Sequence, residues 1–115
     1  MRKTEHQPER VYYSISQVAR MFNVNPSLIR FWEKEFDIIK PHKNKKGNRY
    51  FTPKDVDNFH LIYHLVKERG FTLQGAREKL KTNPNEVQRD FEIVKTLDKL
   101  RDFLLNLKEG LKQAD

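Results

Sequence analysis

Two short amphipathic helices separated by a tight turn are encoded in residues 14–34, and this stretch constrains the fold more than any other part of the chain. Ser14 is a candidate N-cap, and Gln17 three residues later completes a capping box that begins a helix. The apolar residues that follow have the spacing of one helical face: Ile15, Val18, Ala19 and Phe22. Asn23 tolerates the left-handed conformation of a sharp turn, and Asn25-Pro26 provides the cap and first residue of a second helix.

The second helix carries its own apolar face, formed by Leu28, Ile29, Trp32 and Phe36. The small side chain of Ala19 lets the two helices cross closely, and Val24 can fill the corner between them. We therefore expect a helix-turn-helix whose second helix is shaped for the major groove of DNA. A helical hairpin that serves only as core is the alternative at this point.

Length and charge set the outer bounds of this interpretation. The 115 residues suffice for one small domain plus an appendage. The net charge is +7, and residues 12–81 alone carry +7, whereas residues 1–11 carry +1 and residues 82–115 carry −1. A polyanionic partner is thus expected for the segment that contains the helix-turn-helix. Residues 1–10 are mostly polar and charged, and we expect a flexible lead-in over residues 1–11.

Several classes of function are disfavoured by what the sequence lacks. Without cysteine, neither disulfides nor thiolate chemistry can form. No apolar run has the length of a membrane span or of a signal-peptide core, so a cytoplasmic protein is expected. No phosphate loop, nucleophile elbow or paired-acid motif is present, and we expect no enzymatic activity.

A cationic loop follows the helix-turn-helix. Residues 43–49 contain four Lys or Arg residues and no acid, with Ile38 and Ile39 before them and Tyr50 and Phe51 after them. This pattern indicates a small β-hairpin, or wing, with Gly47-Asn48 near its tip. A charge run is often only a solvated face, but its position after a helix-turn-helix favours contact with phosphate.

The remainder of the chain is predicted to be helical. Thr52-Pro53 begins a third helix that continues to Arg69 and ends at Gly70. Thr72 begins a short helix that buries Leu73, Ala76 and Leu80, and residues 83–85 break the chain again.

A long helix is expected over residues 85–113, with an apolar seam in 4-3-4-3-4 spacing. The residues of this seam are Ile93, Leu97, Leu100, Leu104, Leu107 and Leu111. Such a seam is typical of a coiled coil, and we predict that it mediates dimerisation. A helix folded back on its own domain is the alternative. The expected fold is thus mainly α: a winged helix-turn-helix over residues 12–81 followed by a coiled-coil helix.

Four ordered blocks of this sequence resemble the DNA-binding domain of MerR-type bacterial transcription regulators. They are Tyr13-Ser14-Ile15-Ser16-Gln17-Val18-Ala19, Ile29-Arg30-Phe31-Trp32-Glu33-Lys34, Gly47-Asn48-Arg49-Tyr50-Phe51-Thr52-Pro53-Lys54-Asp55-Val56 and Gly70-Phe71-Thr72-Leu73. The resemblance covers residues 12–81 and places the last helix where the family has its dimerisation helix. It implies a nucleoid-associated homodimer that binds an inverted repeat in double-stranded DNA and distorts the promoter spacer, with RNA polymerase as a further partner. An excisionase-like or nucleoid architectural protein that bends DNA is the alternative.

The resemblance, together with the spacing, assigns the expected DNA contacts. They are Ser14, Ser27, Arg30, Phe31, Lys34, Lys43, Lys45, Lys46, Arg49, Tyr50 and Arg69. Arg30 can bind a guanine edge or a phosphate, or alternatively pair with Glu33 or Glu35 within its helix. Phe31 departs from the family's usual tyrosine, which puts a phosphate hydrogen bond from that position in doubt.

The chain resembles the small members of the family that have no sensor domain. We therefore expect no cofactor and no metal site. His60 and His64 have a spacing that can chelate a metal, but no third ligand is evident, and paired surface or interhelix histidines are favoured instead.

Overall fold

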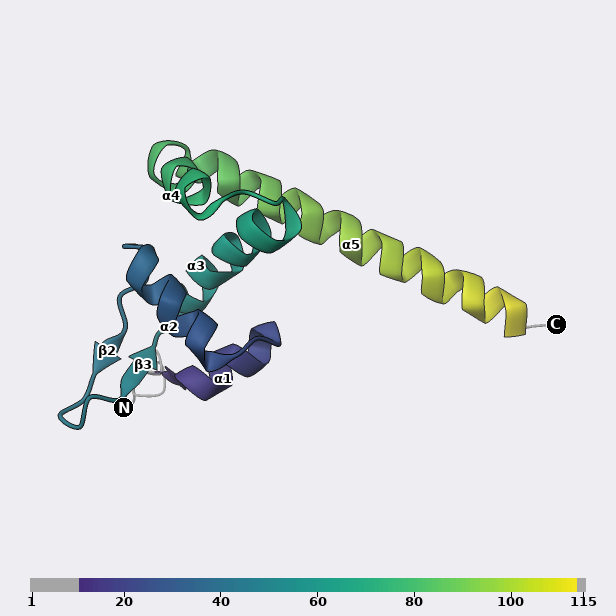
Figure 1. Cartoon of the computed structure of the whole chain (residues 1–115). Helices are drawn as coiled ribbons and strands as arrows, with labels where there is room; N and C mark the ends of the chain where they lie inside the picture. The colour runs from purple at the N-terminus through teal and green to yellow at the C-terminus, as the bar shows by residue number, and fades with distance from the viewer. Residues whose placement is uncertain (1–10, 114–115) are drawn as a thin grey trace, which may run out of the picture. The chain divides into compact units, whose positions relative to one another are not determined.

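The computed structural model describes residues 11–113 (Figure 1), and the chain divides into two compact units between Arg77 and Glu78. The elements of the first unit are β1 (Tyr13–Ser14), α1 (Ile15–Phe22), α2 (Pro26–Glu35), β2 (His42–Lys43), β3 (Arg49–Phe51), α3 (Pro53–Tyr63) and the π-helical segment η2 (His64–Glu68). Helix α4 (Leu73–Thr82) crosses the boundary, and α5 (Pro84–Gln113) lies in the second unit. The expected mainly helical fold with a small wing and a long last helix is confirmed.

Helices α1 and α2 form the predicted helix-turn-helix. The predicted capping box is present: the Ser14 hydroxyl accepts from the backbone N–H of Gln17 at 3.2 Å, and Gln17 Oε1 accepts from the backbone N–H of Ser14 at 2.8 Å. Asn23 ends α1 in the left-handed conformation, with φ of 55°. Asn25 takes the N-cap position of α2, but its side chain makes no capping hydrogen bond. The local start signal of α2 is therefore Pro26, whose fixed φ suits the first helical turn.

The wing belongs to a three-stranded antiparallel sheet with the order β1-β3-β2. The hairpin of β2 and β3 was expected from the sequence, whereas the pairing of β1 with β3 was not. Tyr13 lies opposite Phe51, and Lys43 lies opposite Arg49. The central strand β3 is therefore held by a strand on each side, and one of these leads directly into α1.

The hairpin begins later than the apolar pair at Ile38 and Ile39 suggested. Between α2 and β2 the chain makes a turn, in which the backbone N–H of Ile39 donates to the carbonyl of Phe36 at 3.2 Å. This turn buries Ile39 and leaves Ile38 at the surface. Strand β2 can therefore pair with β3 only from His42 onward, after the chain has left the core.

Helix α3 begins as predicted, but it does not continue as a regular α-helix. Thr52 and Asp55 form a capping box around its start, with Pro53 in the first turn. After Tyr63 the helix widens into the π-helical segment η2, and Gly70 then adopts a φ of 74°. Because π-helical turns are rare and often occur at functional sites, the residues of η2 are candidates for a functional role.

Phe59 of α3 is the centre of the core and is fully buried. Its ring lies 6.2 Å from that of Phe22, 6.5 Å from that of Trp32 and 5.5 Å from that of Phe51, measured between centroids. These rings come from α1, α2 and β3. Burying each such side chain contributes about 1.5–3 kcal/mol, so this cluster fixes α2 with one side inward and the opposite side outward.

Helix α5 is continuous over 30 residues, which corresponds to a length of about 45 Å. Within residues 11–113, which the structure describes, no helix is both long enough and apolar enough to span a membrane.

Candidate nucleic-acid interface

The outer side of α2 carries three of the predicted contacts. Ser27, Arg30 and Lys34 are all exposed, whereas Ile29 and Trp32 on the opposite side are 0% and 1% exposed. The spacing of three and four residues places the polar group on one face. An extended cation and a hydroxyl that project from one helical face have the reach needed for base edges and phosphates in a major groove.

The alternative pairing of Arg30 within its own helix is not formed. Glu33 instead contacts Arg49 of β3 with an Nε–Oε1 distance of 2.6 Å. Glu35 contacts Arg77 of α4, again at 2.6 Å. Both acids of α2 are thus engaged by arginines from other elements.

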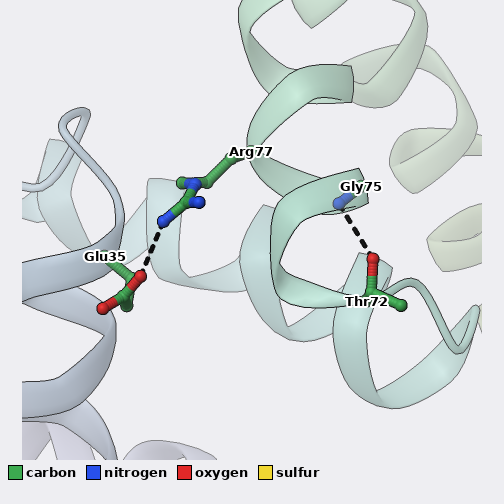
Figure 2. A network of polar contacts seen from close by, with 4 residues as sticks. All are labelled: Glu35, Thr72, Gly75 and Arg77. Atoms are coloured by element: carbon green, nitrogen blue, oxygen red, sulfur yellow. Dashed lines mark hydrogen bonds and ion pairs between the residues drawn. The ribbon is translucent and has the colours of Figure 1, made fainter.

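Figure 2 shows how Glu35 and Arg77 lie toward one another, the first from the end of α2 and the second from α4. The start of α4 is held by Thr72, whose hydroxyl accepts from the backbone N–H of Gly75 at 2.9 Å. The ion pair is partly exposed, so its own contribution to stability is expected to be below about 1 kcal/mol. Its position nevertheless ties the C-terminal end of the proposed recognition helix to α4.

The tip of the wing is ordered by one side chain. Asn44 Oδ1 accepts from the backbone N–H groups of Lys46 and Asn48, both at 2.9 Å. Gly47 completes the turn with a φ of 85°, a conformation that favours glycine. Lys43, Lys45 and Lys46 are exposed on this hairpin. Their ammonium groups are therefore presented by a preformed loop, which suits contact with successive phosphates.

Arg49 and Tyr50, the two predicted contacts at the end of the wing, are partly buried. The Arg49 contact with Glu33 is an ion pair and not an aligned hydrogen bond, since neither Nε nor Oε1 has hydrogen-bond geometry. The ring of Tyr50 packs edge-on against Tyr12, with centroids 6.3 Å apart. The ring centroid of Tyr12 also lies 5.4 Å from that of His42. Tyr12 therefore packs against both wing strands, β2 and β3.

Ser14 and Arg69 are also predicted DNA contacts, and both side chains interact with other residues of the chain. The Ser14 hydroxyl caps α1 and is half-buried. The Arg69 guanidinium lies 6.0 Å from the ring centre of Phe71. Ser14 therefore acts at least as a cap, and Arg69 is exposed next to the left-handed Gly70.

An open hollow of about 470 Å³ lies beside α2 and includes a residue that sequence reasoning missed. It is lined by Val24, Asn25, Ser27, Leu28, Phe31 and Lys67. Phe31 is 42% exposed. Lys67 belongs to the π-helical segment η2, which brings its side chain to the surface that also carries Ser27. The sequence gives little reason to single out Lys67 as a candidate contact, because no local pattern indicates the π-helical turn that brings it to this surface.

His60 and His64 differ in their exposure to solvent. His64 is buried, with Nδ1 3.0 Å from Oε1 of Glu68, and His60 is exposed with its ring 4.6 Å from that of Phe22. Within residues 11–113, no cluster of three or more His, Cys, Asp or Glu side chains has the arrangement of a metal site.

The six residues of the predicted dimerisation seam share one face of α5, and all are exposed. Their exposed fractions lie between 51% and 67% for Ile93, Leu97, Leu100, Leu104, Leu107 and Leu111. Phe103 beside the seam is 62% exposed. A contiguous apolar surface of this kind is typical of an interaction site.

Comparison with known proteins identifies relatives over most of the chain. The family model for MerR HTH family regulatory proteins matches residues 13–83. An uncharacterized HTH-type transcriptional regulator of Synechocystis, slr0701, is 27% identical over 105 residues, which are 91% of this chain and 74% of that protein. The regulator MlrA of Escherichia coli is 32% identical over 76 residues, which are 66% of this chain but 31% of MlrA. The chain thus spans about a third of MlrA.

Solved structures share the fold. HiNmlR, a MerR family regulator lacking the sensor domain and bound to promoter DNA, superposes with a TM-score of 0.54 at 20% identity over 88% of both chains. A MerR family regulator from Bacillus cereus gives a TM-score of 0.56 at 19% identity, over 90% of this chain and 82% of that one. The relatives are transcription regulators, which confirms the expectation that the chain is not an enzyme. Because the family match covers well over half of its residues, the chain belongs to the MerR HTH family of regulatory proteins.

Proposed function

We propose that this protein is a sequence-specific regulator that binds double-stranded DNA, with α2 as its recognition helix. One observation carries the proposal: α2 buries Ile29 and Trp32 and presents Ser27, Arg30 and Lys34 to solvent. A recognition helix needs this division, since its outer face must be free of the protein and its inner face must be held by the core.

The wing supports the same proposal. Its lysines extend the cationic surface beyond α2, and the ordered tip reduces the entropy lost when they contact phosphates. Lys67 adds a cation to the lining of the hollow that also includes Phe31. HiNmlR, which shares the fold, is bound to promoter DNA, and the named relatives are transcription regulators.

We further propose that the protein acts as a homodimer through the exposed seam of α5. More than half of each seam side chain is exposed to solvent in the single chain, and a helix with such a face is stabilised by a partner helix. An antiparallel pair would place the two DNA-binding units on an inverted repeat. As the resemblance to MerR regulators implies, such a dimer would distort the promoter spacer, with RNA polymerase as a further partner.

Selection of bound duplexes from a random pool tests this function. We expect enrichment of an inverted repeat whose half-sites are separated by whole helical turns. Binding without any enriched sequence would contradict the proposal and favour the architectural alternative.

A further inference from the structure

The contact between Glu33 and Arg49 joins the recognition helix to the wing. Nε of Arg49 lies 2.6 Å from Oε1 of Glu33, and the Glu33 side chain is only 14% exposed, that of Arg49 31%. The pair is therefore more shielded from water than the pair of Glu35 and Arg77, whose side chains are 31% and 44% exposed. A shielded pair is screened less by salt than an exposed one.

The two residues lie between the surfaces that the proposed function uses. By helical periodicity, Glu33 is on the flank of α2, between the outer face with Arg30 and the inner face with Trp32. Arg49 is the first residue of β3 and lies opposite Lys43 in the hairpin. The ion pair consequently sets the position of the wing cations relative to the base-reading face of α2.

The chemistry of the guanidinium allows one residue to serve two partners. Its donors form a planar fork, and the contact with Glu33 uses Nε, so the two Nη groups are at the other end of the fork. A lysine has a single point charge and cannot hold a carboxylate with one edge and a phosphate with another.

We propose that Glu33 is a positioning residue for specific DNA binding: it orients Arg49 so that the Nη groups face a DNA phosphate and fixes the wing relative to α2. This inference rests on the proposed DNA-binding function. Without Glu33, the Arg49 side chain can still bind a phosphate, but it can do so in many positions. Its contact then no longer depends on how the bases are placed against α2. By holding Arg49 in place, Glu33 thus makes the attraction between Arg49 and phosphate depend on the position of that phosphate relative to the bases at α2.

The test compares binding to the selected duplex with binding to a scrambled duplex of the same length. For Glu33→Gln, we expect affinity for the scrambled duplex to stay equal or rise, since an acid is removed, while the ratio of specific to scrambled affinity falls about tenfold. Asp37→Asn, at an exposed acid just after α2, makes the same change in net charge and should leave the ratio unchanged. Arg49→Lys should lower the ratio as Glu33→Gln does, and thermal unfolding checks that each variant is folded.

The mutant cycle of Glu33→Gln with Arg49→Gln identifies the route of the effect. If Glu33 acts through Arg49, Glu33→Gln should change the ratio little once Arg49 is absent. Additive losses would overturn the inference, as would equal weakening of both duplexes by Glu33→Gln or the same loss in Asp37→Asn. If Glu33→Gln does not fold, an unchanged ratio in Arg49→Lys overturns it instead. A wild-type protein that binds no duplex contradicts the proposed function itself.

Discussion

The almost fully buried carboxylate of Asp55 accepts a hydrogen bond at 3.1 Å from the backbone N–H of Lys40, which precedes it by 15 residues. Its other oxygen accepts from the backbone N–H of Thr52, also at 3.1 Å. Lys40 comes just before β2 and Thr52 just after β3, so one side chain closes both ends of the wing hairpin. The wing is then held at its base by Asp55, at its side by Glu33 and at its tip by Asn44.

Replacing Asp55 should destabilise the first unit. Asp55→Ala leaves two sheltered backbone N–H groups without their acceptor, and hydrogen bonds to a charged group contribute about 1.5–3 kcal/mol. We expect a loss of that size in the free energy of unfolding, measured with urea. Asp57→Ala, at an exposed site on the same helix, is the matched control and should cost less than about 0.5 kcal/mol. If both variants lose the same free energy of unfolding, the hydrogen bonds of Asp55 do not stabilise the hairpin.

Removing the wing lysines should change how DNA binding depends on salt. The double variant Lys45→Ala and Lys46→Ala removes two exposed cations and no packing, so the slope of log K against log [salt] should become shallower by up to about 1.8 per protomer. All duplex sequences should be weakened alike. Lys95→Ala with Lys99→Ala removes two cations from α5 and serves as the control, with an unchanged slope. A slope that does not respond to the wing variant would exclude these lysines from the interface.

Local sequence signals predicted the helical parts of this fold well. The capping box at Ser14, the cap at Thr52, the left-handed Asn23 and the glycine after η2 all act within a few residues of their position. Interactions of this short range can be read from spacing alone. The same reasoning assigned the outer face of α2 through Arg30, because a buried Trp32 two positions away fixes which side faces solvent.

The parts that sequence reasoning missed depend on contacts between distant residues. Strand β1 has two residues, too few for a period-2 pattern, and it exists because β3 offers it an edge. The sequence allows Glu33 to pair with Arg30 within α2, but the tertiary fold brings Arg49 to it. The π-helical segment that places Lys67 beside Phe31 has no local signature either. These features determine how the candidate interface is held together, and only the packed structure reveals them.

Arg30 and Lys67 should differ in what they contribute to recognition. If Arg30 makes a bidentate contact with a base, Arg30→Ala should cost roughly 1–3 kcal/mol and relax the preference at one position of each half-site. Lys67→Ala should instead weaken all sequences alike, as expected for a phosphate contact beside the hollow. Repeating the duplex selection with each variant measures both effects. If Arg30→Ala weakens binding to all sequences equally, Arg30 contacts the DNA phosphates and not a base.

Charging the seam of α5 should abolish the proposed dimer. Leu100→Glu with Leu104→Glu would bury two unpaired carboxylates per chain in a helix pair, at a cost that such an interface cannot sustain. We expect the variant to sediment as a monomer and to bind a half-site only weakly, while its first unit stays folded by thermal unfolding. The control is Asn106→Glu with Gln113→Glu, which adds the same charge on the opposite side of α5 by helical periodicity and should remain dimeric. A wild-type protein that sediments as a monomer well above the concentrations needed for DNA binding would contradict both the dimer and the two-fold operator, because one recognition helix can read only one half-site.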